Sequence, residues 1–191
     1  MKTLFDIEPE FPAGFIYSPA FLNTAEESDL HKAILKLDLQ TVVFRGFEAK
    51  RKVMSFGYDY HFNNRSISPG IPIPEDFYPL IQKTANYLKI PSYKFEELLV
   101  TAYPPGSVIN WHRDAPPFEL IAGISLLSDC NFKLRPYQKN KQVRGSTISI
   151  PVQRCSLYVM QGEVREEWEH SISETKTLRY SITLRTLRQQ F

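Results

Sequence analysis

Apolar residues recur at two different spacings along this chain, and the change between them divides the sequence in two. Leu30, Ile34 and Leu37 lie on one face of a helix. They follow Thr24-Ala25-Glu26-Glu27, which has the form of a capping box, so a helix is predicted from Thr24 to about Leu37. A second helix is predicted from Pro79 or Leu80 to about Leu88, because Ile90-Pro91 then ends it.

The segment between the two predicted helices has a different character. Val53–Tyr60 is rich in aromatic residues and interrupted by Gly57, which favours a strand or a hairpin. Ser68–Pro74 is rich in proline, which is typical of a surface loop.

From Glu97 onward the chain consists of short apolar segments bounded by Pro, Gly, Asp or Asn, each predicted to be a strand. These segments are Leu98–Tyr103, Val108–His112, Leu120–Leu127, Asn131–Leu134, Thr147–Val152, Ser156–Met160 and Leu178–Leu187. Closely spaced strands after two helices indicate an α+β, mainly β fold: a double-stranded β-helix (jelly-roll) core with the helices packed outside. We assign 1–191 to one domain, in which 1–96 supplies the N-terminal helices and a substrate-lid region and 97–191 the jelly-roll core.

Composition changes this picture little. A net charge of +2 and 42% hydrophobic residues are ordinary for a soluble protein and do not by themselves indicate a nucleic-acid binder. Cys130 and Cys155 are too few for a disulfide framework and are expected to be reduced thiols. Asp6 and Glu8 interrupt the N-terminal segment, so no secretory signal is predicted, and no apolar run is long enough to span a bilayer. We therefore expect a cytoplasmic monomer without a membrane partner, or a nuclear protein if the source is eukaryotic.

The last predicted strand has one polar face. Arg179, Ser181, Thr183 and Arg185 alternate with Tyr180, Ile182, Leu184 and Thr186. If the mostly apolar second face packs outward against a helix or sheet, the two arginines point into the barrel, where they need anionic partners. Arginine suits bidentate binding of a carboxylate, so a small dicarboxylate is one possible partner. The alternative, which composition alone favours, is a half-exposed strand whose arginines meet water and surface acids.

His112-Arg113-Asp114 and the distant His170 form the other polar pattern. On a strand or at its end, a spacing of two residues puts His112 and Asp114 on the same face. Two imidazoles and one carboxylate can occupy one face of an octahedral Fe(II) and leave the remaining positions open for an oxidant and a co-substrate. The pair alone is weak evidence, because chance produces His-x-Asp in many sequences of this length.

Taken together, the motifs from Leu98 to Arg188 resemble, in order and spacing, those of the AlkB-type Fe(II)- and 2-oxoglutarate-dependent dioxygenases. The matching motifs are Tyr103-Pro104-Pro105-Gly106, Trp111-His112-Arg113-Asp114, Gly123-Ile124-Ser125-Leu126, Ser156-Leu157-Tyr158 with Gly162, Trp168-Glu169-His170-Ser171-Ile172, and the strand Arg179–Arg185. Upstream, Phe56-Gly57-Tyr58-Asp59-Tyr60 is similar to the family's Gly-Tyr-x-Tyr element. With all of these motifs present, the last strand is better interpreted as carrying buried arginines that bind an anion than as a half-exposed strand with surface arginines.

The resemblance implies a role for each matching residue. His112, Asp114 and His170 would bind Fe(II), and O2 would be the second co-substrate beside 2-oxoglutarate. Arg179 would hold the distal carboxylate of 2-oxoglutarate and Arg185 would lie nearer the metal. Tyr103 would form a hydrogen bond with the same co-substrate, with Ser181 as a secondary contact. Thr101 stands where the best-known bacterial member has Asn, so no role is carried over to it.

The family resemblance points to alkylated bases in DNA or RNA as substrates. Such a base must be flipped into a pocket, which Tyr58 and Tyr60 are candidates to line, although both could serve ordinary aromatic packing. Trp111 is expected to point away from the His112–Asp114 face. The segment from Lys133 and Arg135 to Arg144 contains five cations and no acid, and could contact phosphates or be a solvated hairpin. Arg45, Lys50, Arg51 and Lys52 form a second cationic group.

Two departures from the family concern the choice of substrate. Pro116 stands where the well-studied DNA-repair member has an acid near the base, and Arg51 aligns loosely with its stacking Trp. The primary hypothesis is oxidative demethylation or hydroxylation of alkylated nucleobases. One alternative is the same oxygenase chemistry on a protein or small molecule, and another is a non-catalytic nucleic-acid-binding module.

Overall fold

The computed structural model describes residues 11–44, 47–61 and 65–189. Within these residues the strands form a seven-stranded sheet, a four-stranded sheet and a two-stranded hairpin. The N-terminal segment with Asp6 and Glu8, and Arg45 of the second cationic group, lie outside the described residues. None of the helices in the described part of the chain is long and apolar enough to cross a membrane.

The large sheet is antiparallel and contains the polar last strand near its centre. In spatial order its strands are β1 (Phe15–Ser18), β11 (Leu157–Met160), β8 (Phe118–Leu126), β13 (Arg179–Leu187), β6 (Phe95–Tyr103), β3 (Phe47–Phe56) and β2 (Gln40–Phe44). The register places Arg179 opposite Tyr103, and Ser181 between Thr101 on β6 and Ser125 on β8. The first half of the chain was expected to supply helices and a lid, but β1, β2 and β3 extend the core sheet.

The four-stranded sheet faces the large one. Its strands, in spatial order, are β10 (Ile148–Val152), β9 (Cys130–Pro136), β12 (Trp168–Ile172) and β7 (Ile109–His112). One apolar cluster joins the two sheets, since it contains Ile121 and Met160 from the large sheet and Phe132 and Ile150 from the small one. This packing is consistent with the predicted jelly-roll core.

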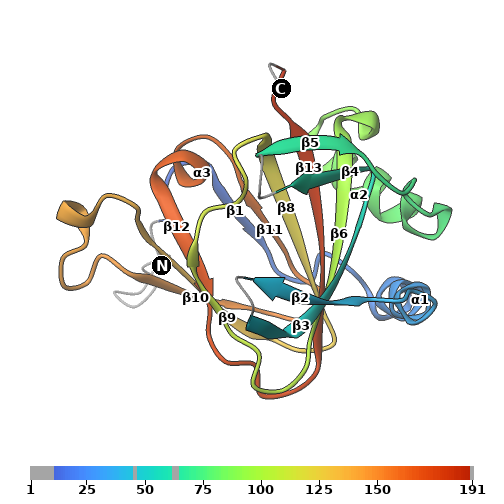
Figure 1. Cartoon of the computed structure of the whole chain (residues 1–191), viewed down its shortest axis with the longest axis horizontal. Helices are drawn as coiled ribbons and strands as arrows, with labels where there is room; N and C mark the ends of the chain where they lie inside the picture. The colour runs from blue at the N-terminus through green and yellow to red at the C-terminus, as the bar shows by residue number, and fades with distance from the viewer. Residues whose placement is uncertain (1–10, 45–46, 62–64, 190–191) are drawn as a thin grey trace, which may run out of the picture.

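Helices cover the outer face of the large sheet. α1 (Thr24–Leu35) and α2 (Tyr78–Leu88) lie on this side, and the hairpin that joins β9 and β10 projects on the opposite side (Figure 1). Leu30 and Ile34 of α1 belong to the same buried cluster as Ile182 and Leu184 of β13. The apolar face of the last strand therefore packs outward, as predicted, and its polar face points between the sheets.

The remaining elements are short. They are β4 (Tyr58–His61), β5 (Ser66–Pro69), α3 (Glu163–Glu167) and the 3-10 turns η1 (Glu75–Phe77), η2 (Ser92–Lys94) and η3 (Lys139–Lys141). β5 pairs with β4, so the predicted Ser68–Pro74 loop begins inside a strand.

Two further predictions need correction. The cap of α1 is Asn23, not Thr24: the Asn23 side chain accepts from the Glu26 N–H at 2.9 Å, and Glu26 accepts in return from the Asn23 N–H at 2.8 Å. The strand β12 was not predicted. Trp168 and Ile172 pack against the inner cluster on the same face as His170, and the outward Glu169 is paired with Arg135, so a histidine stands at the centre of a short alternating pattern.

Glu27 attaches α1 to the sheet. Its carboxylate, on a side chain that is only 2% exposed, accepts from the Leu127 N–H at 2.8 Å and from Nε of Arg154 at 2.7 Å. Burial alone would raise the pKa of Glu27, but these donors outweigh it and the pKa lies below its ordinary 4.5. The attachment is therefore complete above pH 4.5 and is lost as the pH falls through the lowered pKa.

We expect Glu27→Ala to lower the free energy of unfolding at neutral pH by about 1–3 kcal/mol, because the Leu127 N–H loses its partner. Urea denaturation measures this change. Asp29→Ala on the same helix is the control. This variant removes an ion pair with Lys32 in which the Asp29 side chain is 76% exposed and the Lys32 side chain 70% exposed. It should therefore change the free energy of unfolding by about 0.5 kcal/mol or less. Equal losses in the two variants would contradict the attachment by Glu27.

Candidate metal and co-substrate site

The three predicted metal ligands lie together between the sheets. His112 ends β7, and its pairing partner on β12 is His170, so their ring centroids are 4.2 Å apart. Asp114 follows β7 and its Oδ2 is 3.5 Å from Nε2 of His170. One ligand atom from each residue lies within 4.8 Å of the others. The three residues predicted as metal ligands therefore come together as a cluster whose donor atoms could hold a metal ion.

Hydrogen bonds orient the ligand atoms. Nδ1 of His112 is 2.8 Å from the Asn110 carbonyl oxygen, so as a donor it leaves Nε2 with the lone pair a metal needs. Nη2 of Arg185 donates to Oδ1 of Asp114 at 2.8 Å, which leaves Oδ2 toward His170. Nη2 of Arg165, from α3, donates to the backbone oxygens of Asp114 and Ala115 at 3.1 and 2.6 Å. Asp114 and Ala115, which follow β7, are thus held by Arg185 from β13 and by Arg165 from α3.

The charge states suit a cation. Burial alone would raise the pKa of Asp114, but Arg185, and then the two histidines, hold it far below its usual range. Burial and neighbouring His112 lower the pKa of His170 to about 3. At neutral pH the cluster therefore offers one carboxylate and a neutral imidazole on His170, which together with His112 make up the two-histidine, one-carboxylate donor set that Fe(II) takes in a facial triad.

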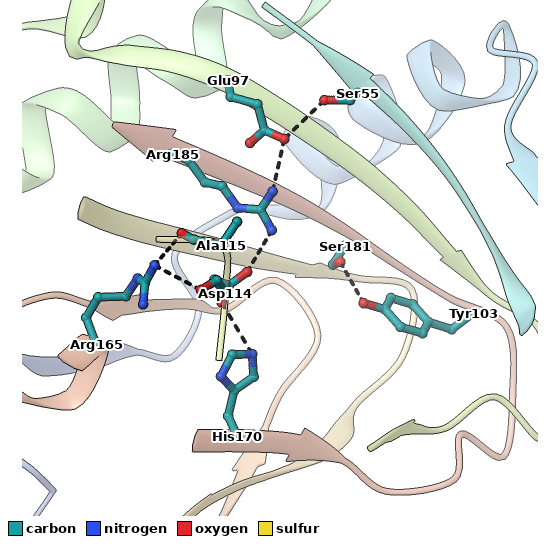
Figure 2. Close-up of polar contacts among 9 residues, drawn as sticks. All are labelled: Ser55, Glu97, Tyr103, Asp114, Ala115, Arg165, His170, Ser181 and Arg185. Atoms are coloured by element: carbon teal, nitrogen blue, oxygen red, sulfur yellow. Dashed lines mark hydrogen bonds and ion pairs between the residues drawn. The ribbon is translucent and has the colours of Figure 1, made fainter. Parts of the chain in front are cut away.

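Arg185 bridges two acids. Nη1 donates at 3.0 Å to Oε1 of Glu97, which also accepts from Oγ of Ser55 at 3.1 Å, while Nη2 holds Asp114 (Figure 2). Burial, more than the repulsion from Asp114, raises the pKa of Glu97 to about 7. Both terminal nitrogens of Arg185 are thus occupied, and only Nε is buried without a partner among the described residues.

Sequence reasoning missed Glu97 and Arg165. Glu97 had a usable signal, since alternation on β6 places it on the same face as Thr101 and Tyr103. Arg165 had none, because the acidic segment around it is typical of a solvated helix.

Arg179 is fully buried and poorly paired. Its Nε donates to Oγ of Ser125 at 2.9 Å, but Nη1 and Nη2 have no partner among the described residues. The guanidinium carbon lies 4.8 Å from the centroid of the Tyr103 ring, and the Tyr103 hydroxyl is 3.3 Å from Oγ of Ser181 (Figure 2). A buried cation with two free donors requires an anion, and a carboxylate matches its fork in geometry and charge.

A cavity of about 350 Å³ lies beside the triad and reaches Tyr103, whose ring packs against the guanidinium of Arg179; Arg179 itself does not line the cavity. It is lined by the triad, by Arg185 and Glu97, and by Tyr103, Thr101, Thr183 and Tyr158. Tyr158 reaches the cavity because Gly123 is its direct partner on β8: a Cβ at Gly123 would lie 2.2 Å from the Tyr158 ring. The volume is at the lower end of the range of small-molecule sites.

The predicted substrate residues divide into two groups. Arg51 and Tyr60 line the cavity, whereas Tyr58 does not. Lys133 and Arg135 lie on the outer face of β9, since Phe132 and Leu134 point inward. Arg135 donates to Glu169 at 2.5 Å and stacks over Trp111, 4.2 Å from the ring. Trp111 is thus on the outside, as alternation predicted.

With this fold and site, the chain belongs to the 2OG-Fe(II) oxygenase superfamily, whose sequence profile matches residues 15–185. The AlkB-type resemblance, the mainly β fold and the dioxygenase class predicted from the sequence are thereby confirmed.

Individual relatives are AlkB homologues. The tRNA (carboxymethyluridine(34)-5-O)-methyltransferase ALKBH8 of Mus musculus is 26% identical over 178 residues, which cover 86% of this chain and 25% of that protein. The RNA demethylase ALKBH5 of Bos taurus is 31% identical over 129 residues, or 61% of this chain and 31% of that protein. The chain thus spans about a quarter of the ALKBH8 protein it matches. The solved structure of OsALKBH1 superposes with a TM-score of 0.71 at 15% identity, over 93% of this chain and 98% of that one, and supports the fold.

Proposed function

We propose that this chain is an Fe(II)- and 2-oxoglutarate-dependent dioxygenase that demethylates or hydroxylates alkylated nucleobases in DNA or RNA. The observation that carries the co-substrate assignment is the buried guanidinium of Arg179, whose two terminal nitrogens lack partners among the described residues. A dicarboxylate that bound this guanidinium would lie beside Tyr103, which lines the same cavity as the triad.

The proposed roles follow from the contacts. His112, Asp114 and His170 would hold Fe(II), and Arg179 would hold the distal carboxylate of 2-oxoglutarate, with the hydroxyls of Tyr103 and Ser181 as hydrogen-bond partners. Arg185, whose terminal nitrogens hold Glu97 and Asp114, keeps the metal carboxylate ionised and has Nε left for the co-substrate. When bound, Fe(II), 2-oxoglutarate and O2 supply the oxidant for a C–H bond of the substrate, with release of succinate and CO2.

The substrate proposal rests on the relatives and on the cavity wall. Two relatives are named for RNA: one is a tRNA methyltransferase and the other an RNA demethylase. Arg51 on β3 and Tyr60 on β4 lie where a flipped base would be enclosed, and Tyr58 lies two residues before Tyr60 on β4. Lys133 and Arg135 would meet phosphates, although Arg135 is already paired with Glu169. We further propose a cytoplasmic monomer, or a nuclear one in a eukaryote.

A succinate-coupled turnover screen against methylated DNA, RNA and nucleosides tests the proposal. We expect succinate formation that depends on the methylated oligonucleotide, with loss of the methyl group measured by mass spectrometry. Robust succinate formation without any change in nucleic acid would favour a protein or small-molecule substrate. Salt-sensitive nucleic-acid binding without any turnover, unchanged by iron or by His170→Ala, would favour a non-catalytic binding module.

A further inference from the structure

Beside the cavity, on its outer side, an arginine and a tyrosine form a stacked pair. The guanidinium carbon of Arg113 lies 3.7 Å from the centroid of the Tyr137 ring. Arg113 also lines the cavity, and its Nη1 donates to the backbone oxygen of Glu166 at 2.8 Å, which fixes its position. Tyr137 is 48% exposed, so part of its ring is open to solvent. The pair therefore connects the cavity to the surface of the β9–β10 hairpin.

The hairpin beyond Tyr137 is positively charged. No acid occurs between Lys133 and Arg144 in the sequence. Three of the four acids of α3 and β12 are matched by cations, because Glu166, Glu167 and Glu169 pair with Arg188, Lys141 and Arg135, and the fourth, Glu163, accepts from Nε1 of Trp168. Among the described residues, Lys139 and Arg144 form no ion pair. The charges of Lys139 and Arg144 are therefore available to an anionic partner that contacts Tyr137.

We propose that Arg113 and Tyr137 form a stacking platform for the nucleotide next to the target base of a single-stranded nucleic acid, with Lys139 and Arg144 beside its phosphates. The inference rests on the proposed function and extends it to strandedness. A base reaches the exposed face of Tyr137 only when it is unpaired, because its faces and edges are covered within a duplex. Aromatic stacking tolerates any base, so the platform would add affinity without reading sequence.

The platform is tested by binding before any turnover is measured. In fluorescence anisotropy with short unmodified single strands, we expect Tyr137→Ala to raise Kd about tenfold, since one stacked base contributes about 1–3 kcal/mol. Tyr137→Phe keeps the ring and should stay within about twofold of the wild type. Tyr93→Ala is the matched control, because Tyr93 is 74% exposed on η2, away from the cavity wall.

The phosphate contacts have a separate signature. Replacing both Lys139 and Arg144 with Ala should reduce the slope of log Kd against log salt by about 1.4, the value for two contacts on a single strand. Lys89→Ala, an exposed cation at the end of α2, should leave the slope unchanged. With a methylated oligonucleotide, Tyr137→Ala should raise KM, whereas turnover of the methylated nucleoside should be unaffected.

These experiments distinguish a failure of the stacking platform from a failure of the proposed function. If Tyr137→Ala binds single strands as tightly as the wild type, the platform is wrong and the proposed function stands. Tighter binding of duplex than of single strands by the wild type would also overturn it. If the wild type binds no nucleic acid and oxidises none, the proposed function itself fails and the platform fails with it.

Discussion

Replacing Arg179 with methionine is expected to weaken 2-oxoglutarate binding by about 100-fold or more. The variant removes the two buried donors that lack partners among the described residues, and with them the proposed bidentate pair with a carboxylate. Hydrogen bonds to charged groups contribute about 1.5–3 kcal/mol each. Anaerobic titration of the Fe(II) protein with 2-oxoglutarate, followed by its charge-transfer absorption, measures the affinity.

The same variant should not destabilise the protein without its ligands. An unpaired buried cation is costly, so a methionine of similar length is expected to leave the melting temperature equal or higher. Arg144→Met, at an exposed position, is the control and should leave the affinity for 2-oxoglutarate unchanged. Wild-type affinity in Arg179→Met would show that the dicarboxylate binds elsewhere. A large loss of stability would show that Arg179 is a structural residue.

Asp114→Ala is expected to abolish succinate formation and to reduce Fe(II) affinity by more than the 10–100-fold that changes in outer-shell partners cost. The reason is that Asp114 supplies the only carboxylate of the described cluster, and its ionisation is maintained by Arg185 and the neighbouring histidines. Metal content after anaerobic loading and desalting measures the loss directly, without turnover.

Glu97→Gln is the matched control for the Asp114 variant. It removes an acid from the same cavity but keeps an oxygen that can accept from Arg185 and Ser55, so Fe(II) binding should stay within about tenfold of the wild type. If Asp114→Ala still holds Fe(II) and produces succinate, the metal centre is not the triad.

The spacing of apolar residues and of helix-ending residues was sufficient to predict much of the fold. The helix predicted to end at Leu88 does end there, and the alternation of the last strand correctly assigned one face to the helices and one to the interior. The strand β12 was missed for a physical reason. It has only five residues, the central inward position is His170 at the site, and the buried outward Glu169 is neutralised by Arg135 from β9, so only Trp168 and Ile172 mark its inner face as apolar. The strands β1 and β2 were missed as well, and their place at the edges of the large sheet depends on pairing with distant segments.

The sequence by itself determined the chemistry of this protein: His112 and Asp114 two residues apart, a distant His170, and two arginines on one face of the last strand. These features are local periodicities and residue types, which are visible without coordinates. Only the tertiary structure decided how the groups are used. Arg185 is bound to Glu97 and Asp114, whereas Nη1 and Nη2 of Arg179 have no partner in the part of the chain that the structure describes, and Lys133 and Arg135 lie outside the cavity. Pairing and burial depend on strand register between segments far apart in the chain, and spacing within one strand carries no information about that register.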